Sequence, residues 1–146
     1  MVAMGFMLNE VDRARQFYHG FLLATKLQCE QRFEWVKFKI TGRALLGAGK
    51  LVENGFEYHF KINYSPFWSS RFDMITVESN DLNKCADTHF NADGSLCLYH
   101  PRHDLKDRPF MPLVEIIPWL SEWVFYYDKY REYKLWVGPE YPHGIK

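Results

Sequence analysis

The dipeptide Asn54-Gly55 lies between two stretches that alternate in period two. After it, apolar side chains occupy every second position across residues 56–64, and before it residues 44–52 form a weaker strand candidate. Asn-Gly is a preferred pair for a two-residue hairpin turn, because both positions of that turn require positive φ. The pattern therefore predicts an antiparallel β-hairpin.

Two more strands are predicted beside this hairpin. Residues 36–40 alternate before it, and residues 72–77 could form a fourth strand after it. With a helix before the strands and another after them, the order of elements predicts an α+β fold and not a wound α/β fold. A chain of 146 residues fits a single domain over residues 1–146.

Helical spacing of apolar residues predicts the two helices. The first runs from about Asn9 to Ala24, with Asn9 suited to the N-cap. The second begins near Pro118, because proline fits the first turn of a helix. Between Glu78 and Met111 the periodicity stops, and so long a loop within a compact domain is usually functional.

The charge balance and the cysteines narrow the classes of protein. Lysine plus arginine is 18 and aspartate plus glutamate is 18, so no global pull toward nucleic acid or membrane is expected. No apolar run reaches the ~18 residues of a membrane span, and Met1–Met7 lacks the basic flank of a signal peptide. Three cysteines argue against a disulfide framework. We expect a cytoplasmic protein; the oligomeric state stays open, with a monomer as the default.

Cys97 lies in the long loop, between Leu96 and Leu98, and follows the turn dipeptide Asp93-Gly94. A cysteine at the end of such a loop can be held rigidly and still be reached by another protein. That placement suits a nucleophile that carries a bulky acyl group. Free cysteine is also among the most buried residue types, so a small core side chain remains the alternative.

The segment from Gly94 to Tyr99 resembles the active-site stretch of ubiquitin-conjugating enzymes, above all the stand-alone conjugating enzymes of CBASS anti-phage operons. That branch shows a Gly-Ser-Leu-Cys-Leu-Tyr stretch, a Pro-Trp pair before the next helix and a Trp…Gly…Glu…His tail. The chain has all three, the latter two at Pro118-Trp119 and at Trp136, Gly138, Glu140 and His143. The resemblance covers the C-terminal part of the chain by motif and the whole chain by element order.

The resemblance implies a UBC-like fold and a protein-conjugating transferase in which Cys97 carries an acyl group as a thioester. Sulfur suits that task, since a thiolate attacks well and leaves well, whereas serine would trap the acyl group as an ester. The implied acyl donor or target is the C-terminus of a cGAS-like nucleotidyltransferase, regulated in this way during antiviral defence. No cofactor is implied. The sequence has no P-loop, so any ATP-dependent activation would come from another protein.

His89 stands where the family has an asparagine, eight residues before the cysteine. In the eukaryotic enzymes that asparagine is assigned a role near the oxyanion of thioester attack. An imidazole N–H can donate the same kind of hydrogen bond, act as a base toward an amine, or lower the pKa of Cys97. We expect His89 to assist transfer and, lying in a polar loop, to add little to stability. The alternative is a histidine that only ties the loop to the backbone.

A zinc site is one competing interpretation of the same loop. Its ligands would come from a set of five residues, namely Cys85, His89, Cys97, His100 and His103. Four of them could bind zinc tetrahedrally, although the spacing is looser than in a zinc finger. The conjugating-enzyme motif explains Cys97 better, so no metal is expected.

Two further interpretations also stay open. A cysteine hydrolase would pair Cys97 with His89 or His100, but the sequence identifies no third, orienting residue. A non-catalytic scaffold of the same fold would bind a partner through the aromatic clusters Phe67-Trp68 and 119–133. Aromatic stripes at helical spacing are mostly core, however.

Overall fold

The computed structural model describes residues 9–67, 71–99, 104–105 and 108–138. Its elements follow in the order α2 (Glu10–Arg32), β1 (Val36–Thr41), β2 (Ala44–Glu53), β3 (Phe56–Tyr64), β4 (Asp73–Glu78), the 3₁₀ helix η1 (Ala86–Thr88) and α3 (Leu113–Tyr133). The four strands pair antiparallel in sequence order. The predicted α+β, UBC-like arrangement is confirmed. None of the helices in these ranges has the length and hydropathy of a membrane span.

The predicted hairpin joins β2 to β3. Asn54 and Gly55 have φ values of 50° and 82°, as a type I′ turn requires, and the flanking Glu53 and Phe56 form the first strand pair. The Asn54 side chain also donates a 2.7 Å hydrogen bond to Asp128 of α3. The turn that the sequence predicts therefore also connects the sheet to the C-terminal helix.

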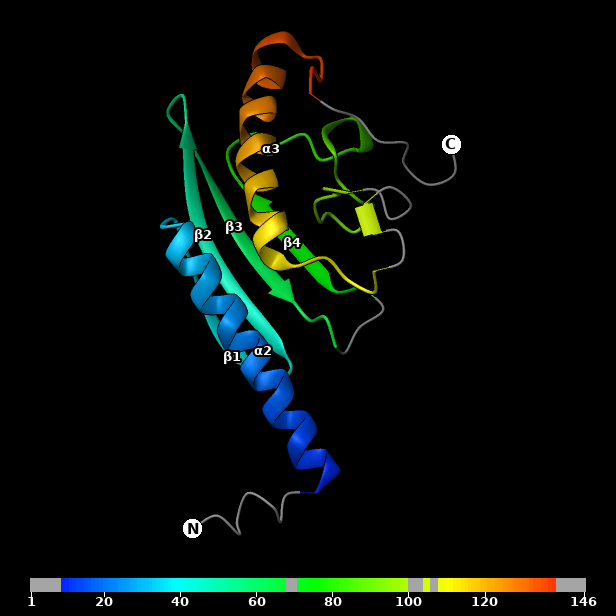
Figure 1. Ribbon diagram of the computed structural model, residues 1–146. Helices are drawn as coiled ribbons and strands as arrows, with labels where there is room; N and C mark the ends of the chain where they lie inside the picture. The colour runs from blue at the N-terminus through cyan, green and yellow to red at the C-terminus, as the bar shows by residue number, and fades with distance from the viewer. Residues whose placement is uncertain (1–8, 68–70, 100–103, 106–107, 139–146) are drawn as a thin grey trace.

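One face of the sheet is buried and the other is exposed. Figure 1 shows both long helices on the same side of the sheet. The β3 side chains that face them are 2% exposed or less, namely Tyr58, Phe60, Ile62 and Tyr64. The alternate β3 positions are exposed. The period-two pattern of the sequence therefore indicates which face of the sheet the helices cover.

Strand β2 contains two glycines. Glycine usually weakens a strand by its flexibility, but these two make room for neighbouring side chains. A Cβ at Gly47 would collide with the Phe38 ring, and one at Gly49 would lie 2.5 Å from the Trp35 carbonyl oxygen. Trp35 comes directly before β1. The glycines therefore make room for Phe38 of β1 and for Trp35.

Helix α2 begins where the sequence predicts and ends later. The Asn9 side chain accepts a 2.9 Å hydrogen bond from the Asp12 N–H, which confirms the N-cap. The helix continues past Ala24 to Arg32 because its buried stripe continues through Thr25 and Cys29. The predicted end was wrong, because the buried residues beyond Ala24 are a threonine and a cysteine and not large apolar side chains.

Helix α3 begins at Leu113, so the prediction that Pro118 lies in its first turn was wrong. An interior proline typically costs about 3 kcal/mol, because it has no N–H for the preceding turn. Burial of a large aliphatic side chain contributes roughly 1.5–3 kcal/mol. Four such side chains around the proline are fully buried, namely Leu113, Ile116, Ile117 and Leu120. Their burial outweighs the lost hydrogen bond.

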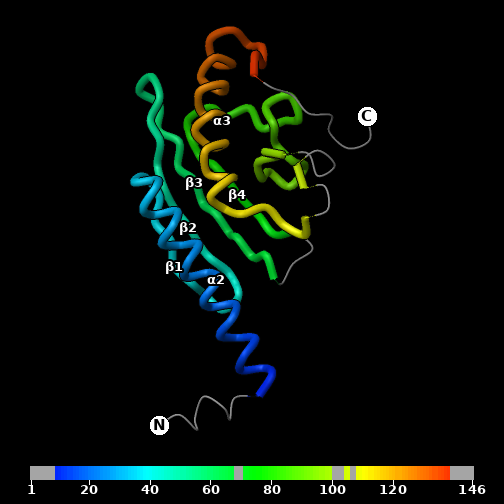
Figure 2. Tube along the Cα trace, in the orientation of Figure 1, coloured from blue at the N-terminus to red at the C-terminus, as the bar shows by residue number. Residues whose placement is uncertain are grey.

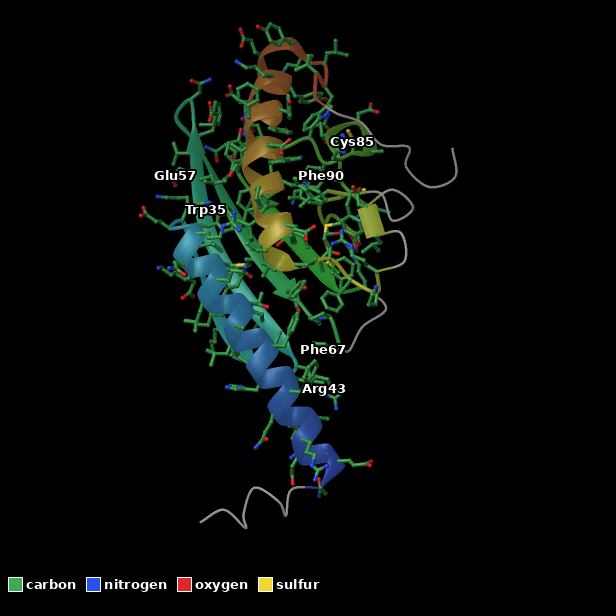
Figure 3. All side chains as sticks on the ribbon, in the orientation of Figure 1. Trp35, Arg43, Glu57, Phe67, Cys85 and Phe90 are labelled. Atoms are coloured by element: carbon green, nitrogen blue, oxygen red, sulfur yellow. The ribbon has the colours of Figure 1, made fainter. Side chains whose placement is uncertain are left out.

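Phe67, the described residue of the first aromatic cluster, packs against the rest of the molecule. Phe67 lies against the N-terminal half of α2 (Figure 3), with its ring centroid 4.7 Å from that of Tyr18 and 4.9 Å from that of Phe21. Trp68 lies outside the described residues. In the second cluster Trp123 is 3% exposed, as expected of a core residue.

The described part of the segment between β4 and α3 is more ordered than a structureless loop. It contains η1 and an isolated antiparallel bridge between Phe90 and Leu96, and both of these side chains are buried. Figure 2 shows the segment, in green, folded beside α3. The Trp123 indole of α3 donates a 2.9 Å hydrogen bond to the Thr88 carbonyl. The segment is thus a folded layer of the core.

Candidate active site

The backbone on both sides of Cys97 is fixed by hydrogen bonds. The Leu96 N–H donates to the Ile75 carbonyl of β4 at 2.8 Å, and the Cys97 N–H donates to the His89 carbonyl at 2.7 Å. These bonds connect the cysteine to the sheet on one side and to His89 on the other. The thiol itself remains half-buried. Such a placement holds the sulfur in one position without closing it off.

A tight turn precedes Cys97, as Asp93-Gly94 predicts. The Gly94 N–H donates to the Asn91 carbonyl at 3.0 Å, and Gly94 has a φ of 88°. The Asp93 carboxylate accepts from the Ser95 N–H at 2.9 Å, and the Asn91 side chain donates to the Leu96 carbonyl at 3.2 Å. Short polar side chains that bond to nearby backbone are what fixes turns of this kind.

Arg71, just before β4, holds this turn from outside. Its guanidinium donates to the Asp93 carboxylate at 2.8 Å and to the Ser95 hydroxyl at 2.6 Å. The pKa of Asp93 is held below its usual range, chiefly by hydrogen bonds from Ser95 and with a further contribution from Arg71. Arg71 is a positioning residue that sequence analysis missed, because its partners lie 22 and 24 positions away.

Burial raises the pKa of the Cys97 thiol. The positive charge of Arg71 acts in the opposite direction, and the carboxylate of Asp73 adds to the increase. The resting side chain is therefore a thiol at neutral pH, and its proton must leave when the sulfur attacks. The lowering of the Cys97 pKa that the sequence suggested for His89 stays a prediction, since the net shift combines several groups.

Behind Cys97 lies a buried polar pair. The Tyr99 hydroxyl donates to Asp73 at 2.9 Å, and the Tyr99 ring stacks on Phe72 with centroids 5.5 Å apart. Asp73 is 2% exposed, and burial raises its pKa. The Cys97 thiol donates weakly, at 3.9 Å, to the Tyr99 carbonyl. This pair ties the chain after Cys97 to β4.

His89 lies at the end of η1 in the left-handed conformation, with a φ of 66°. Its side chain is only 6% exposed, and its ring centroid is 4.8 Å from that of Trp136 at an angle of 44°. We expected His89 to lie in a polar loop that tolerates substitution, and that premise was wrong because His89 is buried. Histidine and asparagine are both among the residues that tolerate positive φ. The backbone conformation at position 89 is therefore compatible with either residue.

Cys97, Leu98 and His89 open onto a small pocket with a cavity volume of about 70 Å³. Its remaining wall is aromatic apart from one carboxylate, and is formed by Trp119, Glu122, Trp123, Tyr126 and Trp136. Glu122 and Tyr126 were not predicted as site residues. Their spacing from Trp119, three and seven positions along α3, places all three on one helix face. That spacing is a signal that the sequence already contained.

Trp136 of the C-terminal Trp…Gly motif lines this pocket, and Gly138 packs against Tyr126, another lining residue. Lys134, with a φ of 59°, ends α3, and the following chain brings the Trp136 ring against His89. A Cβ at Gly138 would lie 2.5 Å from the Tyr126 ring, so only glycine permits this approach. Glu140 and His143, the rest of the motif, lie outside the described residues.

The residues of the zinc interpretation lie partly outside the described ranges. His100 and His103 fall there, and within the ranges no three side chains of His, Cys, Asp or Glu gather as metal ligands would. Cys85 lies at the start of η1 (Figure 3), where its sulfur is 3.6 Å from the Thr88 hydroxyl. In this position Cys85 caps the 3₁₀ helix.

Comparison with known proteins gives one finding. The model of the family described as Type II CBASS E2 protein matches residues 25–144. The matched stretch holds the whole sheet, Cys97, His89 and α3. No curated protein and no solved structure shows a significant match.

Proposed function

This chain belongs to the type II CBASS E2 family, and on that premise we propose that Cys97 carries an acyl group as a thioester. A role in CBASS defence and an E2-like character follow from the family; the covalent chemistry is the proposal. The observation that carries it is the setting of the sulfur. Cys97 is half-buried, its backbone is fixed on both sides, and it opens onto a pocket shared with His89.

The reaction has two steps. In the first, the Cys97 thiol gives up its proton to water or to His89 and the sulfur attacks the activated carbonyl of a protein C-terminus, so that a C–S bond forms and the activating group leaves. In the second, an amine attacks the thioester, a C–N bond forms, and the Cys97 thiolate leaves and is protonated. Activation of the carboxylate is assigned to a separate ATP-using protein.

His89 is the proposed partner in these steps. As a neutral donor its imidazole N–H would stabilise the oxyanion that develops on the acyl carbonyl. As a base it would accept the proton of the attacking amine. Packing against Trp136 restricts the orientation of the ring, which favours a preorganised role in either case.

The proposed acyl donor or target is the C-terminus of a cGAS-like nucleotidyltransferase, whose modification regulates its synthesis of a nucleotide messenger. The small pocket beside Cys97 argues against a nucleotide itself as the bound group. Sites for drug-sized ligands enclose roughly 300–1,000 Å³, whereas this cavity has about 70 Å³.

The test is a non-reducing gel of the chain expressed together with its candidate partner and the activating protein. An adduct cleaved by reductant and by hydroxylamine is expected for the wild type and for Cys85→Ala, and is absent for Cys97→Ala. An adduct that survives Cys97→Ala overturns the proposal. Binding of the partner without any adduct would indicate the scaffold alternative, and release of a shortened tail would indicate the hydrolase.

A further inference from the structure

We propose that the α3 side of the pocket is a binding site for the attacking amine, in which Glu122 holds an alkylammonium group among the rings of Trp119 and Tyr126. The ligand class is a primary amine on a thin aliphatic chain, such as the end of a lysine side chain. The binding site is inferred from the pocket alone. Its use in discharging a thioester rests on the proposed function.

The placement of Glu122 carries this inference. It is an exposed residue of α3, yet its side chain lines the same cavity as Cys97 and His89. Trp119 and Tyr126 lie three residues before it and four residues after it, on the same helix face. A carboxylate with an aromatic residue on each side of it along α3 thus lines the same cavity as the nucleophile.

The charges around the cavity fit a cation. Aromatic faces attract an ammonium group within about 6 Å of the ring centroid, and a carboxylate accepts charge-assisted hydrogen bonds from it. None of the described residues that line the pocket is a lysine or an arginine. An incoming ammonium group therefore meets one carboxylate and several aromatic faces, and no fixed positive charge from the lining residues.

Glu122 acts here as a docking group and not as the base. Its charge stabilises the protonated amine, whereas only the neutral amine can attack the thioester. The bound ammonium group must first lose a proton, to water or to His89. The nitrogen then bonds to the acyl carbon, the C–S bond breaks, and the electron pair stays on the Cys97 sulfur, which takes up the second proton that the nitrogen loses. Glu122 should therefore lower the amine concentration needed for half-maximal discharge.

Binding can be tested without any thioester. n-Butylammonium is titrated into the intact chain, and the indole N–H signals of the tryptophans are followed by NMR. We expect saturable shifts for the wild type and for Glu132→Gln, an exposed α3 control. For Glu122→Gln the affinity should be about fivefold lower, because one unit charge at about 4 Å in water is lost. n-Butanol should give no saturable shift. Equal affinity in Glu122→Gln and Glu132→Gln overturns the inference.

The second test uses the Cys97 thioester. With n-butylamine at neutral pH, Glu122→Gln should need about fivefold more amine for half-maximal discharge than Glu132→Gln. With hydroxylamine, which is uncharged at neutral pH, the two variants should discharge alike. If the thioester forms but n-butylamine discharges both variants equally, the inference fails and the proposed function stands. If n-butylammonium binds through Glu122 but no thioester ever forms, the proposed function fails and the amine site stands.

Discussion

The sheet and the segment that carries Cys97 are held by different kinds of interaction. In the sheet, consecutive strands pair along their length, and the buried face is apolar, with fully buried side chains such as Tyr58. The turn before Cys97 is held by polar side chains, with Asp93, Ser95 and Arg71 in one network. Apolar burial supplies most of the stability of a fold, whereas hydrogen bonds fix direction and distance. The sheet should therefore govern stability, and the Cys97 segment should govern reactivity.

The largest expected effect lies in the sheet. Phe60 is 1% exposed and contacts Trp123 of α3 edge to face. Replacing a buried Phe by Ala typically costs about 3–5 kcal/mol, through lost burial and the cavity left behind. Phe60→Ala should lower the free energy of unfolding by that amount in a urea titration. Lys61→Ala, next in sequence but on the exposed face, should change it by less than about 0.5 kcal/mol; a larger loss there would contradict the division between the two faces.

His89 is where the two regions meet, because it is buried and also lines the pocket. His89→Ala should slow adduct formation or discharge about a hundredfold, as loss of one oxyanion donor does. It should also lower stability by about 1–2 kcal/mol, since alanine in the left-handed conformation is strained. His89→Asn should recover part of both, because asparagine tolerates that conformation and restores a donor. Rates are measured on gels and stability by thermal unfolding.

The outcome for His89→Gly separates its two roles. Glycine relieves the backbone strain and restores no donor. Stability close to that of His89→Asn with a rate close to that of His89→Ala would assign the rate to the side chain. A near-normal rate in His89→Gly would show that His89 has no catalytic role.

Arg71 tests whether the polar network acts on reactivity alone. Arg71→Gln removes the charge-assisted bonds to Asp93 and Ser95, so the turn loosens and transfer should slow roughly tenfold, since small misplacements in an active site cost rate. Because the positive charge lowers the Cys97 pKa, the variant should also shift the pH profile of Cys97 alkylation upward. The thermal midpoint should fall only slightly. Arg108→Gln, which breaks an exposed pair with Glu115, is the control and should alter neither rate nor pH profile.

The same contrast explains what the sequence could predict. The hairpin at Asn54-Gly55 and the bounds of β3 follow from local periods and turn chemistry, both of which act over a few residues. Cys97 was identified by its motif. The spacing of Glu122 from Trp119 and Tyr126 places it on one face of α3, but only the structure shows that this face meets the loop. Arg71 could not be found from the sequence, because it acts across 22 positions. Polar networks of this kind leave no periodic trace in a sequence.

The core between the sheet and α2 can also be compared with the Cys97 segment through one thiol in each. Cys29 of α2 is fully buried, and burial raises its pKa to about 11 from an ordinary value of 9.0. The half-buried Cys97 should therefore react with iodoacetamide in the native protein far faster than Cys29, which must wait for unfolding. Reaction of Cys29 at the rate of Cys97 would show that the α2 side of the core opens easily. Peptide mapping after a timed quench distinguishes the two sites.

The raised pKa of Cys29 also predicts how stability depends on pH. Between pH 9 and 11 the folded chain keeps the thiol proton that the unfolded chain has lost, so folding is favoured by this group below pH 9 and loses that contribution as the pH rises. The loss at pH 10 is about 1.4 kcal/mol, and it grows toward about 2.7 kcal/mol above pH 11. Urea titrations at pH 7.5 and 10 should show a decrease in the wild type that is smaller by about 1.4 kcal/mol in Cys29→Ala. The difference between the two pH values cancels the small cavity that alanine creates at either pH. An equal pH dependence in both proteins would mean that the core around Cys29 admits water.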